Sequence, residues 1–142
     1  MSGKTTSLLA TVCTLTCFML PNLVFYMFDL EILYNRGLSL KGSIFMVQQK
    51  TDYRPRVGDT ILFVHPKYTN NILKKVSHVE GEAYQPMVGY DAASENDINK
   101  KQTVPKDHLA VLGDHPKSYD SRYASFGFIP MNNIRGKAWR IF

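Results

Sequence analysis

The sequence predicts a small, mostly β domain preceded by one membrane-spanning helix. A charge-free apolar stretch lies near the N-terminus, and short runs of β-branched and aromatic residues separated by Gly and Pro follow it. The composition, 44% hydrophobic and 20% charged, is typical of a globular chain, and 142 residues suit one small domain beyond that stretch. We therefore expect an anchor and short linker over residues 1–34 and a folded domain over residues 35–142.

The apolar stretch covers residues 7–28 without a charge. As a helix rising about 1.5 Å per residue, it can cross a hydrocarbon core of about 30 Å, and its threonines can bond to the helix's own carbonyls. A cleaved signal peptide is the alternative, but no small-x-small cleavage site follows the stretch. Lys4 precedes it, and Asp29 and Glu31 follow, so the positive-inside rule predicts a cytoplasmic N-terminus and an external domain.

The rest of the chain predicts a mostly antiparallel, partly closed β domain with long connections. No amphipathic helical pattern of useful length appears there, and turn residues separate the apolar runs. The polar stretch 91–101 is expected to form a surface loop. The expected strands are residues 43–48, 60–65, 72–79, 108–112 and 137–142.

Several function classes are disfavoured by the pattern of charge and motifs. The net charge is +5, but the basic residues are scattered and form no stripe interleaved with aromatics, so we expect no nucleic-acid partner. No His-Glu-x-x-His or paired-carboxylate spacing occurs, so we expect no metal and no cofactor. A Gly-x-Ser-x-Gly elbow is also absent, and none of the four histidines lies in a recognisable catalytic motif, so a Ser-His-Asp triad is disfavoured.

Four segments of the domain carry the chemical signal. They resemble, in order, the conserved segments of bacterial type I signal peptidases, and most closely those of the conjugative-transfer relatives, the TraF-type pilin-maturation peptidases. The segments are NRGLSLKGSIF (35–45), RVGDTILF (56–63), LKKV (73–76) and GDHPKSYDSR (113–122), the last followed by Gly127 and Pro130.

The resemblance implies a fold of the signal-peptidase/LexA-like type and a serine endopeptidase with a Ser/Lys dyad. Ser39 matches the nucleophile and Lys74 the general base. Ser118 matches a residue that orients the lysine, and Asp120 and Arg122 match an ion pair that braces the active-site segment. The implied partners are the lipid bilayer and a membrane-tethered precursor, either pilin-like or bearing a signal peptide. The implied location is the bacterial inner membrane, with the catalytic domain on the periplasmic face.

Two positions near Ser39 depart from the family pattern. Gly37 stands where many relatives carry a Ser or Thr whose hydroxyl helps hold the oxyanion, so this site would depend more on backbone N–H groups, beginning with that of Ser39. Lys41 stands where proline is usual.

A lysine acts as a base near pH 7 only if its pKa falls about three units from 10.4, a change of roughly 4 kcal/mol. Desolvation can supply this. Strand alternation puts Lys74 on one face with Ile72 and Val76. Taken without the resemblance, the same pattern also fits solvated lysines on an edge strand.

Three alternatives stay open or weakly supported at this stage. The acyl-enzyme could be resolved by water or by the precursor's own N-terminus, which gives a cyclic product. A LexA-like self-cleaving regulator would need a DNA-binding helix-turn-helix where this chain has an apolar stretch. The third alternative is a catalytically impaired, membrane-anchored assembly component with the same fold, and Gly37 and Lys41 are its best support.

Overall fold

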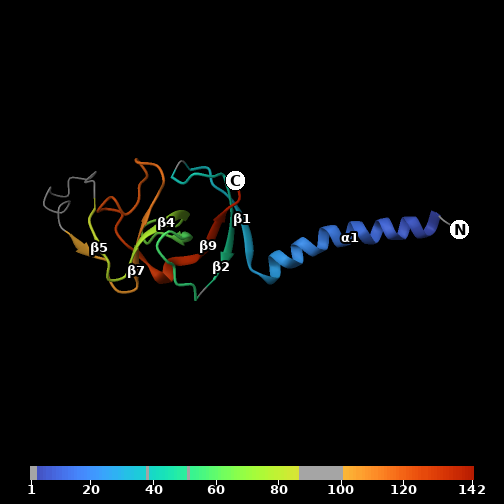
Figure 1. Cartoon of the computed structure of the whole chain (residues 1–142), viewed down its shortest axis with the longest axis horizontal. Coiled ribbons are helices and arrows are strands. Elements are labelled where there is room, and N and C mark those ends of the chain that lie inside the picture. The colour runs from blue at the N-terminus through green and yellow to red at the C-terminus, as the bar shows by residue number, and fades with distance from the viewer. Residues whose placement is uncertain (1–2, 38, 51, 87–100) are drawn as a thin grey trace.

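The computed structural model describes residues 3–37, 39–50, 52–86 and 101–142, with side chains from residue 10 onward. It confirms a mostly β, antiparallel domain preceded by one apolar helix (Figure 1). The elements in chain order are α1 (Gly3–Met27), β1 (Leu30–Tyr34), β2 (Ile44–Gln49), β3 (Thr60–Val64), β4 (Asn71–Val79), β5 (Ala83–Tyr84), β6 (Gln102–Thr103), β7 (His108–Leu112), β8 (Ile129–Pro130), the 3₁₀ turn Met131–Asn133 and β9 (Ile134–Arg140).

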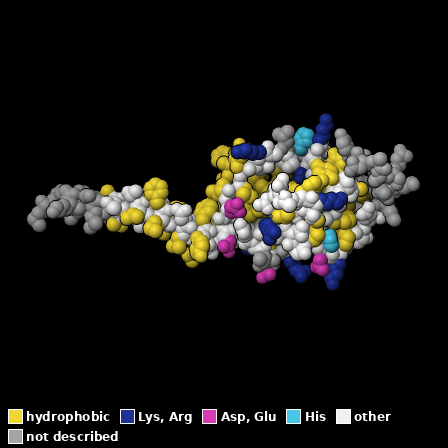
Figure 2. Space-filling model, turned by 180° about the vertical axis from the view of Figure 1, so that it is seen from behind, with side chains coloured by type: hydrophobic (Ala, Val, Ile, Leu, Met, Phe, Trp, Pro, Cys, Tyr) yellow, Lys and Arg dark blue, Asp and Glu magenta, His cyan; other side chains and the backbone are white. Residues whose placement is uncertain are grey.

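Helix α1 projects from the domain as a rod and is long and apolar enough, over Ala10–Met27, to cross a membrane. None of that span is buried against the domain, and Figure 2 shows hydrophobic side chains along its exposed length. Its polar side chains bond to helix carbonyls, as expected for the threonines: Thr14 Oγ1 donates to Ala10 O at 2.7 Å, and Asn22 Nδ2 donates to Phe18 O at 2.7 Å. These bonds satisfy groups that lipid cannot.

The main sheet has seven antiparallel strands in the order β1-β2-β9-β3-β4-β7-β8, and it curls into a half-barrel. Residues 30–34, which were expected within the anchor and short linker, form the edge strand β1, which pairs with β2 from Leu30↔Gln48 to Tyr34↔Ile44. The physical reason is packing: Leu33 lies against the apolar cluster that contains Phe45 and Val47. The sheet therefore begins three residues after α1 ends.

Two apolar clusters cover opposite faces of the sheet, and β3 separates them. Ile61 and Phe63 belong to the larger cluster, whereas Leu62 between them belongs to the smaller one with Leu40 and Phe45. Successive residues of a strand point to opposite faces, so β3 is buried on both sides. This central position fixes the neighbouring strand β4, which carries Lys74.

The expected strands differ from the observed ones at their ends, and the short strands β5, β6 and β8 were not predicted. The last strand begins earlier than predicted, at Ile134, and ends at Arg140, although the Ile141 N–H still donates to Ile44 O at 2.9 Å. Strands β5 and β6 pair as a small hairpin. The polar loop expected over 91–101 lies outside the described residues except for its last position.

Candidate active site

Lys74 lies in the middle of β4 with its side chain buried, and only 4% of the residue is exposed. It pairs with Ile61 across β3–β4, and Ile72 and Val76 on its own face both pack into the larger apolar cluster. The next residue, Lys75, points the other way and is largely exposed. Lys74 thus lies on an apolar face, as predicted. The alternative, a solvated lysine on an edge strand, does not hold, because β4 lies between β3 and β7.

The ammonium of Lys74 has one hydroxyl partner in this apolar setting. Lys74 Nζ donates to Ser118 Oγ at 2.5 Å, and Ser118 is itself buried. Burial lowers the pKa of Lys74 to about 8, while the negative charge of Asp120 acts to raise it and the positive charge of Arg122 to lower it. At that pKa about a tenth of the amines are neutral at pH 7.

Gly113, directly after β7, brings the Lys74–Ser118 pair next to the backbone of Ser39. A Cβ at position 113 would lie 2.3 Å from Ser118 Oγ and 2.5 Å from the carbonyl oxygen of Ser39. Both atoms therefore lie against the same side of Gly113, which must lack a side chain for them to fit. This close approach joins residues that are far apart in the sequence.

Asp114 fastens the Ser39 segment to the sheet through three bonds. Its backbone N–H donates to Ser39 O at 2.6 Å. Its carboxylate accepts the Lys41 N–H at 2.8 Å and Lys75 Nζ at 2.7 Å. Burial alone would raise the pKa of Asp114, but the bonds from Lys75 and Lys41 hold it below its usual range. Asp114 thus connects β4, the turn after β7 and the loop of Ser39.

Asn35 organises the loop that contains Ser39. Its side-chain amide donates to Gly37 O at 3.2 Å and to Gly42 O at 3.1 Å, and its side-chain oxygen accepts the Gly37 N–H at 3.2 Å. A Cβ on Gly37 would lie 3.7 Å from Ser39 Oγ, so the hydroxyl lies beside this bend. For the Ser39 N–H, no acceptor is found among the described residues.

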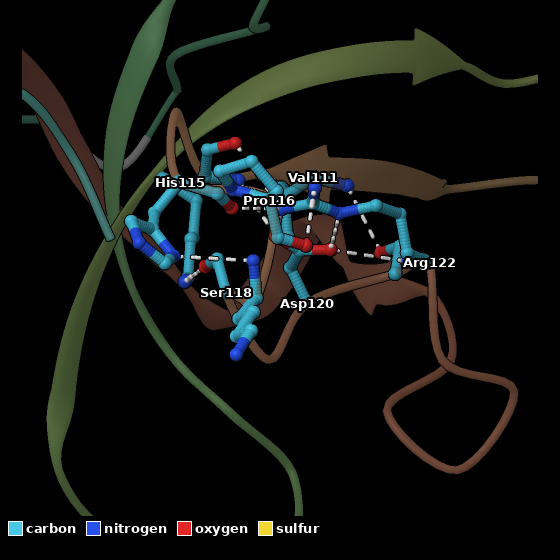
Figure 3. Close-up of polar contacts among 10 residues, drawn as sticks. Val111, His115, Pro116, Ser118, Asp120 and Arg122 are labelled. Atoms are coloured by element: carbon cyan, nitrogen blue, oxygen red, sulfur yellow. Dashed lines mark hydrogen bonds and ion pairs between the residues drawn. The ribbon is translucent and has the colours of Figure 1, made fainter. Parts of the chain in front are cut away.

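Asp120 and Arg122 form the expected ion pair behind Ser118 (Figure 3). Arg122 Nη2 and Nε donate to the two carboxylate oxygens of Asp120 at 2.6 and 2.8 Å, and the Gly113 N–H donates to Asp120 at 2.7 Å. Burial alone would raise the pKa of Asp120, but these bonds hold it below its usual range. Arg122 also donates to the carbonyls of His115 and Pro116, so it holds the whole turn after β7.

The structure thus brings Lys74, Ser118, Asp120 and Arg122 into one connected cluster with the backbone of Ser39 beside it. Within the part of the chain that is described, no hydrogen bond joins Lys74 Nζ to Ser39 Oγ. The described residues also contain no group of His, Cys, Asp or Glu that could hold a metal ion.

Comparison with known proteins finds a family match for part of the chain. Residues 77–142 match the family model described as signal peptidase, peptidase S26. The matched segment contains Ser118, Asp120 and Arg122 and begins after Ser39 and Lys74. A crystal structure of a signal peptidase I from Enterococcus faecalis V583 is similar at 25% identity, covering 60% of this chain and 97% of that chain, with a TM-score of 0.43. No curated protein matches the sequence.

Three residues of the cluster were not predicted as site residues: Asn35, Gly113 and Asp114. Each belongs to a segment that carried the resemblance, yet the Gly-Asp pair was interpreted only as a turn. The sequence did show a Gly-Asp turn directly after a predicted strand. Its place beside Lys74 follows only from the pairing of β4 with β7, which the sequence does not give.

Proposed function

We propose that this chain is a membrane-anchored serine endopeptidase of the signal-peptidase type. The observation that carries the proposal is the buried amine of Lys74, hydrogen-bonded to Ser118 and placed beside the backbone of Ser39. A desolvated lysine with a lowered pKa is the kind of base that activates a serine hydroxyl. The match of residues 77–142 to the signal peptidase family supports the same reaction class.

In the proposed reaction, neutral Lys74 takes the proton of Ser39 Oγ as that oxygen attacks the scissile carbonyl carbon. The tetrahedral oxyanion is held by backbone N–H groups, including that of Ser39, and Gly37 contributes no hydroxyl. The C–N bond then breaks, and the leaving amine receives the proton from Lys74. Water attacks the resulting ester with Lys74 again as base, which releases the new carboxylate and restores Ser39.

The neighbouring residues act on Lys74 and Ser39 without touching substrate in this scheme. Ser118 orients the amine of Lys74, and Asp120 with Arg122 holds the turn that carries Ser118. The scheme requires Ser39 Oγ to come within hydrogen-bonding distance of Lys74 Nζ when substrate binds, since catalytic hydrogen bonds in unliganded sites often tighten only then.

The proposed substrate is an exported precursor held in the membrane by its own apolar helix. The short connection between α1 and the sheet, which begins three residues after the helix ends, supports a site close to a bilayer. The proposed location is the periplasmic side of a bacterial inner membrane, in accordance with the positive-inside rule. A conjugative pilin is one such precursor, and its N-terminal amine could replace water and form a cyclic product. Mass spectrometry of the mature substrate separates the two outcomes, because cyclisation leaves the product lighter by one water.

The test is substitution in cells that export the precursor. Ser39→Ala and Lys74→Ala should each abolish processing while protein levels stay unchanged. Lys106→Ala is the control, because Lys106 is exposed and lies outside both the Lys74–Ser118 cluster and the loop of Ser39. The precursor that accumulates uncut identifies the substrate.

A catalytically impaired assembly component is the second candidate function. The specific observation that favours it is the lack of a hydrogen bond between Ser39 and Lys74 among the described residues. Normal processing in both the Ser39→Ala and the Lys74→Ala variants would establish this candidate and refute the peptidase.

A further inference from the structure

An open groove of about 610 Å³ runs along the loop that carries Ser39. Arg36, Gly37, Leu40 and Lys41 contribute to its lining. Since a Cβ on Gly37 would lie only 3.7 Å from Ser39 Oγ, the groove passes beside the proposed nucleophile. A peptide bound with its scissile carbonyl at Ser39 therefore has the groove next to it.

The groove is bordered by positive charge. Arg36 and Lys41 are exposed, and the methylene groups of exposed Arg140 lie over Gly42, where a Cβ would come 2.5 Å from Arg140 Cδ. None of these three cations forms an ion pair with an acidic residue in the described part of the chain.

The acid that shares this region, Asp114, is already engaged. The positive charge of Lys41 helps to lower the pKa of Asp114. Both carboxylate oxygens already accept hydrogen bonds, one from Lys75 Nζ at 2.7 Å and the other from the backbone N–H of Lys41 at 2.8 Å. Arg36, Lys41 and Arg140 can therefore still bind a carboxylate of another molecule. Arg in particular binds carboxylates through two parallel N–H···O bonds.

We infer that this groove selects precursors that carry an Asp or Glu within about five residues of the scissile bond, since an extended chain advances about 3.3 Å per residue. The inference rests on the proposed peptidase function and adds a charge preference to it. An anionic lipid headgroup could use the same cations, but the groove follows the loop of Ser39, where a substrate chain must lie. The acidic residue of a precursor is therefore the occupant that the geometry favours.

The experiment uses the full chain in nonionic detergent and internally quenched peptides with an Ala-x-Ala cleavage site. The peptides are identical except for Glu, Gln or Lys at each of the positions flanking that site. At low ionic strength kcat/KM should be about three- to tenfold higher for Glu than for Gln at one or more positions, and salt should reduce the difference. Arg36→Glu and Lys41→Glu should reverse the preference toward Lys. Lys106→Glu, at an exposed residue two positions before β7 begins, is the matched control.

Equal cleavage of the Glu, Gln and Lys peptides at every position would overturn the inference and leave the peptidase function standing. An effect of Arg36→Glu and Lys41→Glu that follows the anionic lipid content of added vesicles, and not peptide charge, would also overturn it in favour of a headgroup site. Absence of any Ser39-dependent cleavage would refute the proposed function and the inference with it.

Discussion

Replacing Lys74 by Met should change how the stability of the domain depends on pH. Lys74 is 4% exposed, and burial lowers its pKa from 10.5 to about 8. Below pH 8 the folded chain holds a buried ammonium that the unfolded chain exposes to water, so folding is disfavoured by roughly 3 kcal/mol, at about 1.36 kcal/mol per pKa unit. As the pH rises from 8 to 10.5, the unfolded state binds more protons than the folded state, and this unfavourable contribution disappears.

The free energy of unfolding of the wild type should therefore rise relative to that of Lys74→Met by about 2 kcal/mol between pH 7 and pH 10. Urea unfolding of the full chain in nonionic detergent measures it. Trp139, the single tryptophan, lies on β9 and reports on the sheet and not on α1. Lys74→Met also loses the hydrogen bond to Ser118, but it does so at both pH values. The change with pH in the stability difference between wild type and variant therefore reports the protonation of Lys74.

Lys75→Met is the control for this measurement. Lys75 is largely exposed and forms a surface ion pair with Asp114, so its removal should change stability by less than about 1 kcal/mol. Parallel pH dependences for the wild type and Lys74→Met would show that the amine is not desolvated, and the reasoning would be refuted.

Two further substitutions test the support of the cluster. Gly113→Ala should slow precursor processing at least tenfold and destabilise the domain by about 1–3 kcal/mol, because the new Cβ overlaps Ser118 Oγ and Ser39 O; unchanged processing rates would contradict this. Asp120→Asn should destabilise by about 3–5 kcal/mol, since it leaves the charge of Arg122 without its partner. The pKa of Asp120 is held below its usual range, so the stability of the wild type should fall as the pH drops below about 4. The stability of the Asp120→Asn variant should fall less steeply. Equal acid sensitivity of the two proteins in denaturation curves would argue against the role of the ion pair.

The fold class was accessible from the sequence because it depends on local alternation, whereas the choice of a buried over a solvated Lys74 depended on the family resemblance. Runs such as residues 60–65 and 72–79 predict strands directly. The same alternation puts Lys74 on one face with Ile72 and Val76, but it does not say whether that face is buried. The apolar helix could also be predicted from the sequence, because its length without charge is a property of one continuous segment.

The connections between segments were not accessible in the same way. Residues 30–34 were assigned to a linker because the register that pairs them with β2 depends on packing of Leu33. Likewise, the roles of Gly113 and Asp114 arise where the end of β7 meets the loop of Ser39. Contacts at such large sequence separation follow from sheet order, which single-strand patterns do not determine.

The pH dependence of peptide cleavage tests the central claim most directly, because it reports the protonation of the base. For the full chain acting on an internally quenched peptide, kcat/KM should rise about tenfold per pH unit from pH 6 and level off above a pH of about 8, where the amine of Lys74 is neutral. A profile that is flat across this range, or that keeps rising up to the ordinary pKa of lysine, would contradict the assignment of Lys74 as the base of Ser39.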